Sequence, residues 1–238
     1  AVALGDPIGP AQDLRPVILG FKAYCEQNDW QAAFYQVLSD NLEEYRRAGF
    51  DVLCIGEEAI VDLKEFTLEG KIGKSLRTPY NHLARLGYQA RLHEPPLADS
   101  LMSELRSISD EWLAMMHGSE KRFSLGWFED AYIRNSPVMA VHTPAGSISA
   151  FTNLVPEYRK NEANIDLMRR RQDTESGTME FLFAALLQWA QSNGFDTFNL
   201  GLSALSGVGE TRDSPNVEQA LRYIYRHFNQ FYNFQGLH

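Results

Sequence analysis

The chain has 238 residues, of which 44% are hydrophobic and 12% aromatic, and it carries a formal net charge of −9. This composition supports one or two hydrophobic cores and excludes an intrinsically disordered chain, which has fewer hydrophobic residues and more charge. The acidic balance argues against indiscriminate binding of nucleic acid, because proteins that bind phosphates by releasing counterions present a basic face.

The cysteines, histidines and apolar runs exclude further classes of protein. Cys25 and Cys54 lie far apart and form no CxxC motif, so we expect neither a disulfide framework nor a thiolate metal site. The six histidines form no HxH or HExxH pattern, and we therefore expect no metal. Because no run of about 18 apolar residues is present, we expect no membrane span in this sequence. The N-terminal AVALGDPIGP has neither a basic region nor a long apolar one, so we expect no signal peptide.

The first half of the chain predicts two helices that are each followed by a strand. Apolar residues at helical spacing predict a helix from about Phe34 to Tyr45, which ends at a left-handed Gly49. The segment DVLCI follows as a short buried strand. A second helix is expected over about 70–86, and the segment LGYQARL then predicts another strand.

The second half predicts a hairpin, a strand, a helix and a further strand. Alternation on either side of the turn TPAG indicates an antiparallel hairpin, and NIDLMR indicates a third strand beside it. A helix with apolar residues from Met179 to Ala190 ends at Gly194, and DTFNL follows as a strand. A last helix is expected over about 217–231, where apolar residues again form one stripe.

Two segments offset by 145 residues are alike: RRAGFDVLCIGEEA at 46–59 and QSNGFDTFNLGLSA at 191–204. Both contain GFD followed by four residues and a glycine, and both lie in a helix–strand–helix order, which indicates two copies of one α/β unit. We therefore expect two domains, at 1–118 and 119–238. The second copy lacks the strand that should follow FYNFQGLH, so we expect the chain to be cut short there.

The order of elements in the second half is that of the acetyltransferase-type (GNAT) α/β fold. In that fold, the loop after the central strand usually holds an acyl carrier's pyrophosphate, with two glycines for close approach. Here the loop region has one glycine and three carboxylates, Asp173, Glu175 and Glu180, which would repel a pyrophosphate. The sequence therefore disfavours coenzyme A, and a cationic group such as an amino acid's ammonium suits the loop better. Alternatively, the carboxylates only complement the helix dipole.

Asp166 and Arg169 are unusual residues for a strand with apolar neighbours. A buried aspartate needs an ionic or hydrogen-bonding partner, and Arg169 is one candidate. Alternatively, Arg169 binds a phosphate and Asp166 orients or deprotonates an attacking group. Because residues i and i+3 face opposite sides of a regular strand, the two meet only at a bulge or at the strand end.

Several motifs together resemble the cytosolic catalytic domain of the bacterial phosphatidylglycerol lysyltransferases, also called multiple peptide resistance factors. The motifs are GDPIGP, IGEEAIVDL, FTLEGKIGKSLR, FSLGWFEDAY, DLMRR, SGTMEFLFAALLQWA, GFDTFNLGLSALSGVGE and FYNFQGL. They cover essentially the whole chain. The resemblance implies an α/β protein built as a tandem pair of acetyltransferase-like (GNAT) folds, with mixed sheets flanked by helices.

The resemblance also implies a reaction and its setting. Members of this family transfer an aminoacyl group from aminoacyl-tRNA to the glycerol hydroxyl of phosphatidylglycerol, and the cationic lipid formed gives resistance to antimicrobial peptides. We expect a lysyl group, although alanyl and arginyl versions share these motifs. Such a transesterification needs no cofactor. The resemblance places the domain at the cytoplasmic face of the cell membrane, with an N-terminal membrane-spanning flippase region in the full-length protein.

The expected site residues fall into three groups. The residues expected to be catalytic, carried over by motif, are Asp166, Arg169 and Glu218. The residues expected to bind substrate are Asn199, Ser203, Ser206, Glu175, Tyr232 and His238. The residues expected to contact tRNA are Lys71, Lys74, Arg170 and Arg171. Turn and cap roles for the strand-end residues, and a solvated face for the lysines, are the alternatives.

Two other functions fit the same sequence. One is a tRNA-dependent aminoacyltransferase that acts on a peptide or protein acceptor. The other is a non-catalytic module that binds lipid or tRNA, although the presence of Asp166 and Arg169 argues against it.

Overall fold

The structure is a computed structural model that describes residues 1–238 except 72, 117–119, 121, 124–125, 157–160 and 205–238. The described residues form two compact units, one of 1–57 with 202–204 and one of 58–201. Each unit has a hydrophobic core of its own.

The smaller unit consists of a two-stranded parallel sheet and short helices. Its elements are β1 (Val2–Leu4), a 3-10 turn (Ala11–Asp13), α1 (Leu14–Gln27), β2 (Ala33–Tyr35), a second 3-10 turn (Ser39–Asn41) and α2 (Leu42–Arg47). Strands β1 and β2 pair in register from Val2 with Ala33. Ile18, Tyr45 and Ala48 form the buried centre of this unit.

The expected helix from about Phe34 is wrong in its first part, because residues 33–35 form a strand and the helix begins only at Leu42. Gln36 has a φ of +60°, which an α-helix does not allow. The apolar spacing instead reflects an aromatic cluster, in which the Phe34 ring lies 5.0 Å from that of Tyr45 and 5.5 Å from that of Phe50.

The strand expected at DVLCI is also wrong, because residues 51–55 have no regular structure and the strand begins at Gly56. Leu53 is 46% exposed, so this apolar segment is not the buried strand that its composition indicated. The left-handed conformation expected at Gly49 is confirmed by a φ of +81°, and that at Gly194 by a φ of +79°.

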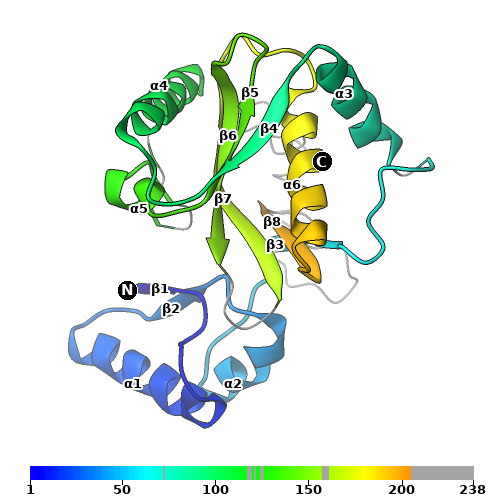
Figure 1. The fold of residues 1–238 in the computed structure, drawn as a ribbon. Coiled ribbons are helices and arrows are strands. Elements are labelled where there is room, and N and C mark those ends of the chain that lie inside the picture. The colour runs from blue at the N-terminus through cyan, green and yellow to red at the C-terminus, as the bar shows by residue number, and fades with distance from the viewer. Residues whose placement is uncertain (72, 117–119, 121, 124–125, 157–160, 205–238) are drawn as a thin grey trace, which may run out of the picture. The chain divides into compact units, whose positions relative to one another are not determined.

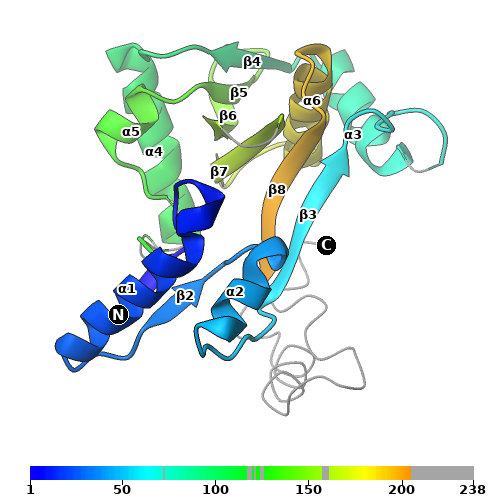
Figure 2. The same cartoon turned by 90° about the horizontal axis from the view of Figure 1, so that it is seen from below.

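The larger unit is organised around a six-stranded mixed sheet (Figures 1 and 2). Its strands, in sheet order, are β3 (Gly56–Asp62), β8 (Thr197–Ala204), β7 (Glu162–Arg170), β6 (Ile148–Pro156), β5 (Val138–His142) and β4 (Gln89–His93). Neighbours from β7 to β4 are antiparallel, whereas β7 and β8 are parallel. The hairpin around TPAG and the strands on either side of the next helix are thereby confirmed.

Helices cover both faces of this sheet, as Figure 1 shows. The helices are α3 (Lys74–Arg85), α4 (Asp99–Met115), α5 (Asp130–Arg134) and α6 (Thr178–Ser192). Side chains from α3 and α6 pack with one face of the sheet, around Leu182 and Phe198. Those from α4 and α5 pack with the other, around Ile108 and Phe151. The helices expected at about 70–86 and from Met179 are confirmed as α3 and α6.

The two segments of the GFD repeat lead into neighbouring strands, because β3 and β8 lie side by side in the same sheet (Figure 2). The described part of the larger unit is thus built on a single mixed sheet. The domain boundary expected between 118 and 119 stays a prediction, since 117–119 and 205–238 lie outside the described residues. None of the described helices is both long and apolar enough to cross a membrane.

A β-bulge interrupts the pairing of β6 with β7. Thr152 pairs with Met168, but Leu154 pairs with Ile165, so Asn153 alone lies opposite both Asp166 and Leu167. A bulge of this kind shifts the alternation of side chains by one residue. As a result Asp166 joins Leu167 on the α4–α5 face of the sheet.

Candidate functional site

The Asp166 side chain is held from two sides by neutral hydrogen-bond donors. The backbone N–H of Gly126 donates to Oδ1 over 2.8 Å, and the Tyr132 hydroxyl, from α5, donates to Oδ2 over 2.7 Å. A Cβ atom on Gly126 would lie 1.9 Å from Oδ2, so only glycine fits beside this carboxylate. The position of Asp166 is therefore fixed by a loop and a helix as well as by its own strand.

Tyr132 is itself held by Asn153, which lies opposite the bulge. The Asn153 side-chain amide donates from Nδ2 to the Tyr132 hydroxyl oxygen over 2.9 Å, and its Oδ1 accepts from Leu167 N–H over 2.8 Å. Burial, and then the hydrogen bond to the Asp166 carboxylate, raises the pKa of the Tyr132 phenol. The phenol therefore stays protonated at neutral pH and remains a donor.

Arg169 lies buried on the same face of the sheet, with 4% of its surface exposed. Its Nη2 donates to Oε2 of Glu120 over 2.8 Å, and its guanidinium carbon lies 4.3 Å from the centre of the Trp112 ring. Its Nη1 has no hydrogen-bond partner among the described residues. Because a buried guanidinium N–H without a partner is costly, this atom is suited to an anion that enters the site.

The interpretation of Asp166 and Arg169 as an ion pair is wrong, because the carboxylate that pairs with Arg169 belongs to Glu120. The other Glu120 oxygen accepts from the backbone N–H of Phe128 over 3.2 Å. Asp166 and Arg169 thus have separate sets of partners on one face of the sheet. The arrangement offers a fixed carboxylate and a guanidinium with an open donor.

The two arginines that follow Arg169 are engaged within the protein. Arg171 donates from Nη1 to Glu111 over 3.0 Å and from Nε to the Ile148 carbonyl over 2.9 Å, which ties the end of β7 to α4 and β6. Arg170 donates to the Arg171 carbonyl over 3.0 Å. Any contact of Arg171 with tRNA would compete with its bond to Glu111.

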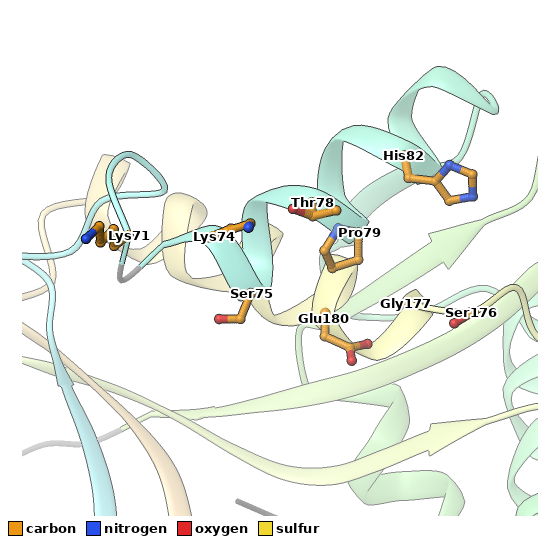
Figure 3. Close-up of a pocket in the computed structure, with 9 residues that line it drawn as sticks. All are labelled: Lys71, Lys74, Ser75, Thr78, Pro79, His82, Ser176, Gly177 and Glu180. Carbon is orange, nitrogen blue, oxygen red and sulfur yellow. The ribbon is translucent and has the colours of Figure 1, made fainter.

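A groove of about 790 Å³ lies between α3 and the start of α6 (Figure 3). In Figure 3, Lys71 and Lys74 lie at one end of α3 and His82 at the other. The lining residues are Lys71, Lys74, Ser75, Thr78, Pro79, His82, Ser176, Gly177 and Glu180. The described structure brings the two predicted lysines together in this groove, and it gives neither of them an ion-pair partner among the described residues.

The other end of the groove is acidic and tightly built. Glu175 lies 3.8 Å from the His82 ring nitrogen. Gly177 precedes α6 with a φ of +88°, and a Cβ there would lie 2.5 Å from the Cβ of Pro79. Only glycine permits both this conformation and this approach of α6 to α3.

Asn199 lies in β8, where its side-chain amide forms hydrogen bonds with residues of the same sheet. Its Nδ2 lies 3.3 Å from Glu58 and 3.5 Å from the buried carboxylate of Glu162, and its Oδ1 accepts from Gly201 N–H over 2.8 Å. Ser203 lies in the same strand, but its side chain lies outside the described part. The remaining predicted residues, Ser206, Glu218, Tyr232 and His238, lie outside the described residues altogether.

Sequence reasoning did not single out Glu120, Gly126, Tyr132 or Asn153 as part of this site. Asn153 carries the clearest signal, because it is an amide in a strand rich in apolar residues, and such a residue needs hydrogen-bond partners when buried. Within the described ranges, no group of three or more histidines, cysteines and acids is placed to hold a metal ion.

Comparison with known proteins shows which family this chain resembles in sequence and structure. The family described as "Phosphatidylglycerol lysyltransferase, C-terminal" matches residues 1–238. A phosphatidylglycerol lysyltransferase of Bacillus subtilis is 36% identical over 236 residues, which are 99% of this chain and 27% of that protein. The solved structure of L-PGS from Bacillus licheniformis is 39% identical with a TM-score of 0.81, over 89% of this chain and 67% of that one.

A more distant solved structure, that of FemX, is 7% identical and superposes with a TM-score of 0.56, over 91% of this chain and 75% of that one. At this identity the likeness concerns the fold alone, an α/β fold with GNAT-like neighbours. The chain spans 27% of the length of the Bacillus subtilis relative, so that relative is a considerably longer protein.

Proposed function

The chain belongs to the family of the C-terminal domain of phosphatidylglycerol lysyltransferase, and from this we propose that it transfers a lysyl group from lysyl-tRNA to phosphatidylglycerol. The family match over the whole chain is the observation that carries the proposal. The geometry of Asp166 and Arg169 supports it, since a lipid headgroup brings both a hydroxyl and a phosphate to the site.

The reaction we propose is a transesterification. A glycerol hydroxyl of the lipid attacks the carbonyl carbon of the aminoacyl ester, a new ester bond forms, and the bond from that carbon to the ribose oxygen of tRNA breaks. The proton of the attacking hydroxyl ends on the departing ribose oxygen, which becomes a free hydroxyl, so atoms and charge balance without a further reactant. Positioning of the two substrates supplies a large part of the rate enhancement in such a step.

Each of the two central residues has a distinct role in this proposal. The open Nη1 of Arg169 binds the phosphate of the lipid, because a guanidinium forms charge-assisted hydrogen bonds with phosphate oxygens. Asp166 accepts a hydrogen bond from the attacking hydroxyl with a lone pair that Gly126 and Tyr132 leave open, and thereby orients and polarises it.

The remaining residues of the proposed site come from the resemblance of the motifs. Glu218, Glu175, Asn199 and the two serines, Ser203 and Ser206, would surround the amino acid, and Tyr232 and His238 would contact the lipid. For Asn199, the hydrogen bonds within the sheet favour a structural contribution.

For tRNA we propose the groove beside α3 as a contact of the phosphate backbone. Lys71 and Lys74 lie at its basic end without an ion-pair partner among the described residues, so both can bind phosphates. Arg170 and Arg171 are weaker candidates, because Arg171 already binds Glu111.

The setting of the domain is part of the same proposal. We place it at the cytoplasmic face of the bacterial membrane, as the catalytic part of a longer protein whose N-terminal region spans the membrane and moves the lipid product across it. The tandem arrangement of two acetyltransferase-like folds also stays a proposal, which the GFD repeat and the matching left-handed Gly49 and Gly194 support.

A transfer assay tests the function directly. The purified chain is incubated with phosphatidylglycerol vesicles and tRNA charged with radiolabelled lysine, alanine or arginine, and label is counted in the lipid extract. We expect label from lysyl-tRNA in the lipid, and none with Asp166→Ala. Label transferred only to an added peptide acceptor would instead establish the peptide or protein reaction, and label left on tRNA throughout would contradict a transferase.

A further inference from the structure

We propose that Asn153 is a positioning residue of the transfer site, which holds the β-bulge at Asp166 and directs the Tyr132 hydroxyl onto the Asp166 carboxylate. The inference rests on the proposed function, because that function gives Asp166 its role. Asn153 touches no reacting atom and acts through its two hydrogen bonds alone.

The first step of the argument concerns the bulge. Because Asn153 lies opposite both Asp166 and Leu167, the ladder between β6 and β7 cannot satisfy every backbone group of these two residues. The Asn153 Oδ1 accepts from the Leu167 N–H in the interior, where Asn153 itself is fully buried and water does not reach it. An apolar residue at 153 would leave that N–H without a partner.

The second step fixes the direction of the hydrogen bonds. The Leu167 N–H can only donate, so the Asn153 atom that faces it must be the oxygen, and the atom that faces Tyr132 must be the NH2 group. That NH2 group can only donate, so the Tyr132 oxygen accepts from it. The single phenolic hydrogen is then left for Oδ2 of Asp166, 2.7 Å away.

The third step connects this network to the site. The chain of bonds runs from the backbone at the bulge through Asn153 and Tyr132 and ends at Asp166, whose other oxygen is held by Gly126. With both oxygens fixed, the carboxylate cannot rotate, and its remaining lone pairs keep one direction. Catalysis by positioning depends on such an arrangement, because small displacements of a reacting group lower the rate strongly.

Two substitutions break the hydrogen bond between Asn153 and Tyr132, one from each side. Asn153→Asp keeps an oxygen for the Leu167 N–H but replaces the donor to Tyr132 with an acceptor. Tyr132→Phe removes the hydroxyl and leaves the bulge intact. The control is Thr152→Val, which alters a fully buried neighbour on β6 whose hydroxyl makes only a 3.4 Å contact to the backbone.

The experiment measures kcat and KM for lysyl-tRNA and for phosphatidylglycerol, together with unfolding midpoints, in the single variants and in the double variant. We expect kcat to fall by about ten-fold or more in each single variant while both KM values change by less than about two-fold. The double variant should be no slower than the slower single variant, because both changes break one chain of bonds. Thr152→Val should retain the wild-type kcat.

Several results would overturn the inference. Additive effects on the unfolding midpoints would show that Asn153 and Tyr132 are not coupled. Coupled midpoints with an unchanged kcat would show a purely structural role. If the wild-type chain transfers no label, the proposed function fails together with the positioning role. The unfolding midpoints of the single and double variants would then still show whether Asn153 and Tyr132 are coupled. Should Asn153→Asp not fold, an unchanged kcat in Tyr132→Phe would by itself refute the proposal.

Discussion

Asp166 and Arg169 lie on the same face of β7 although they are three residues apart in the chain. The bulge opposite Asn153 shifts the alternation between them, so both side chains point toward α4 and α5. Each has its own partner, because Asp166 accepts a hydrogen bond from Tyr132 and Arg169 forms an ion pair with Glu120. A substrate that carries both a hydroxyl and a phosphate can therefore engage both residues without breaking an ion pair between them.

Replacement of Arg169 by lysine should impair binding of the lipid. Lysine keeps the positive charge, but it has no planar group to stack on Trp112 and donate to Glu120 and a phosphate at the same time. We expect the KM for phosphatidylglycerol to rise by about ten-fold or more in a vesicle assay, with a smaller change in the KM for lysyl-tRNA. An unchanged lipid KM in Arg169→Lys would refute the role of Arg169 as the phosphate ligand.

The same arginine should also contribute to stability. Arg169→Met leaves the carboxylate of Glu120, of which 17% is exposed, without its cationic partner. Loss of one member of a buried pair costs about 3 kcal/mol, so urea unfolding should show a decrease of that order in the free energy of unfolding. Arg169→Met combined with Glu120→Leu should recover most of the loss. If the double variant is no more stable than Arg169→Met, the pair is not the cause.

Gly126 should tolerate no side chain. In Gly126→Ala the new Cβ would lie 1.9 Å from Oδ2 of Asp166, so either the loop or the carboxylate must move. We expect transfer to fall by about ten-fold or more, because the displaced carboxylate no longer orients the hydroxyl. The rate of the transfer assay measures this effect.

Gly20→Ala is the control for this substitution, because nothing lies within 4 Å of the added atom and Gly20 is inside α1. There alanine should keep full activity and stabilise the helix by about 0.5–1 kcal/mol. Equal activity of Gly126→Ala and Gly20→Ala would mean that the contact with Asp166 does not limit the reaction.

The strands β4 to β8 of the larger unit were predictable because their side chains alternate or follow a turn such as TPAG, whereas β3 was wrongly expected at residues 51–55. The helix expected from Phe34 was not, since the apolar residues there pack into an aromatic cluster with Tyr45 and Phe50, and periodicity alone does not distinguish the two. The left-handed Gly49 and Gly194 followed from their place after helices.

The site was predictable only in part. Asp166 and Arg169 stood out as charged residues in an apolar strand, whereas their partners come from segments 34 and 49 residues away in sequence. The bulge depends on a one-residue shift in pairing, which hydrophobic patterning does not encode. For that reason the role of Asn153 becomes visible only in the folded chain.

Lys71 and Lys74 should govern the salt dependence of tRNA binding. Lys71→Gln with Lys74→Gln removes two positive charges from the basic end of the groove. We expect the KM for lysyl-tRNA to rise several-fold at low salt, while kcat is kept. The slope of the logarithm of this KM against the logarithm of the salt concentration should decrease by about one to two.

Arg85→Gln is the matched control for this pair, because Arg85 is exposed at the other end of the same helix. It also removes a positive charge from α3, but it should leave the salt slope unchanged. If the lysine variant and the Arg85 variant have the same slope, the groove does not contact tRNA.

His93 should make the fold less stable in mild acid. Its Nε2 lies 3.0 Å from that of His142, and burial, then His142 and Arg91, lower the pKa of His93 below its ordinary value of 6.5. At pH values between 6.5 and the lowered pKa of His93, the unfolded chain binds the proton more readily than the folded chain. The free energy of unfolding therefore decreases as the pH falls through this window, and it is unaffected above the window. In His93→Gln, the drop in melting temperature between about pH 7.5 and pH 5.5 should be smaller than in the wild type by roughly 2 °C or more. An equal drop in the wild type and in His93→Gln would show that this histidine is protonated alike in the folded and unfolded chains.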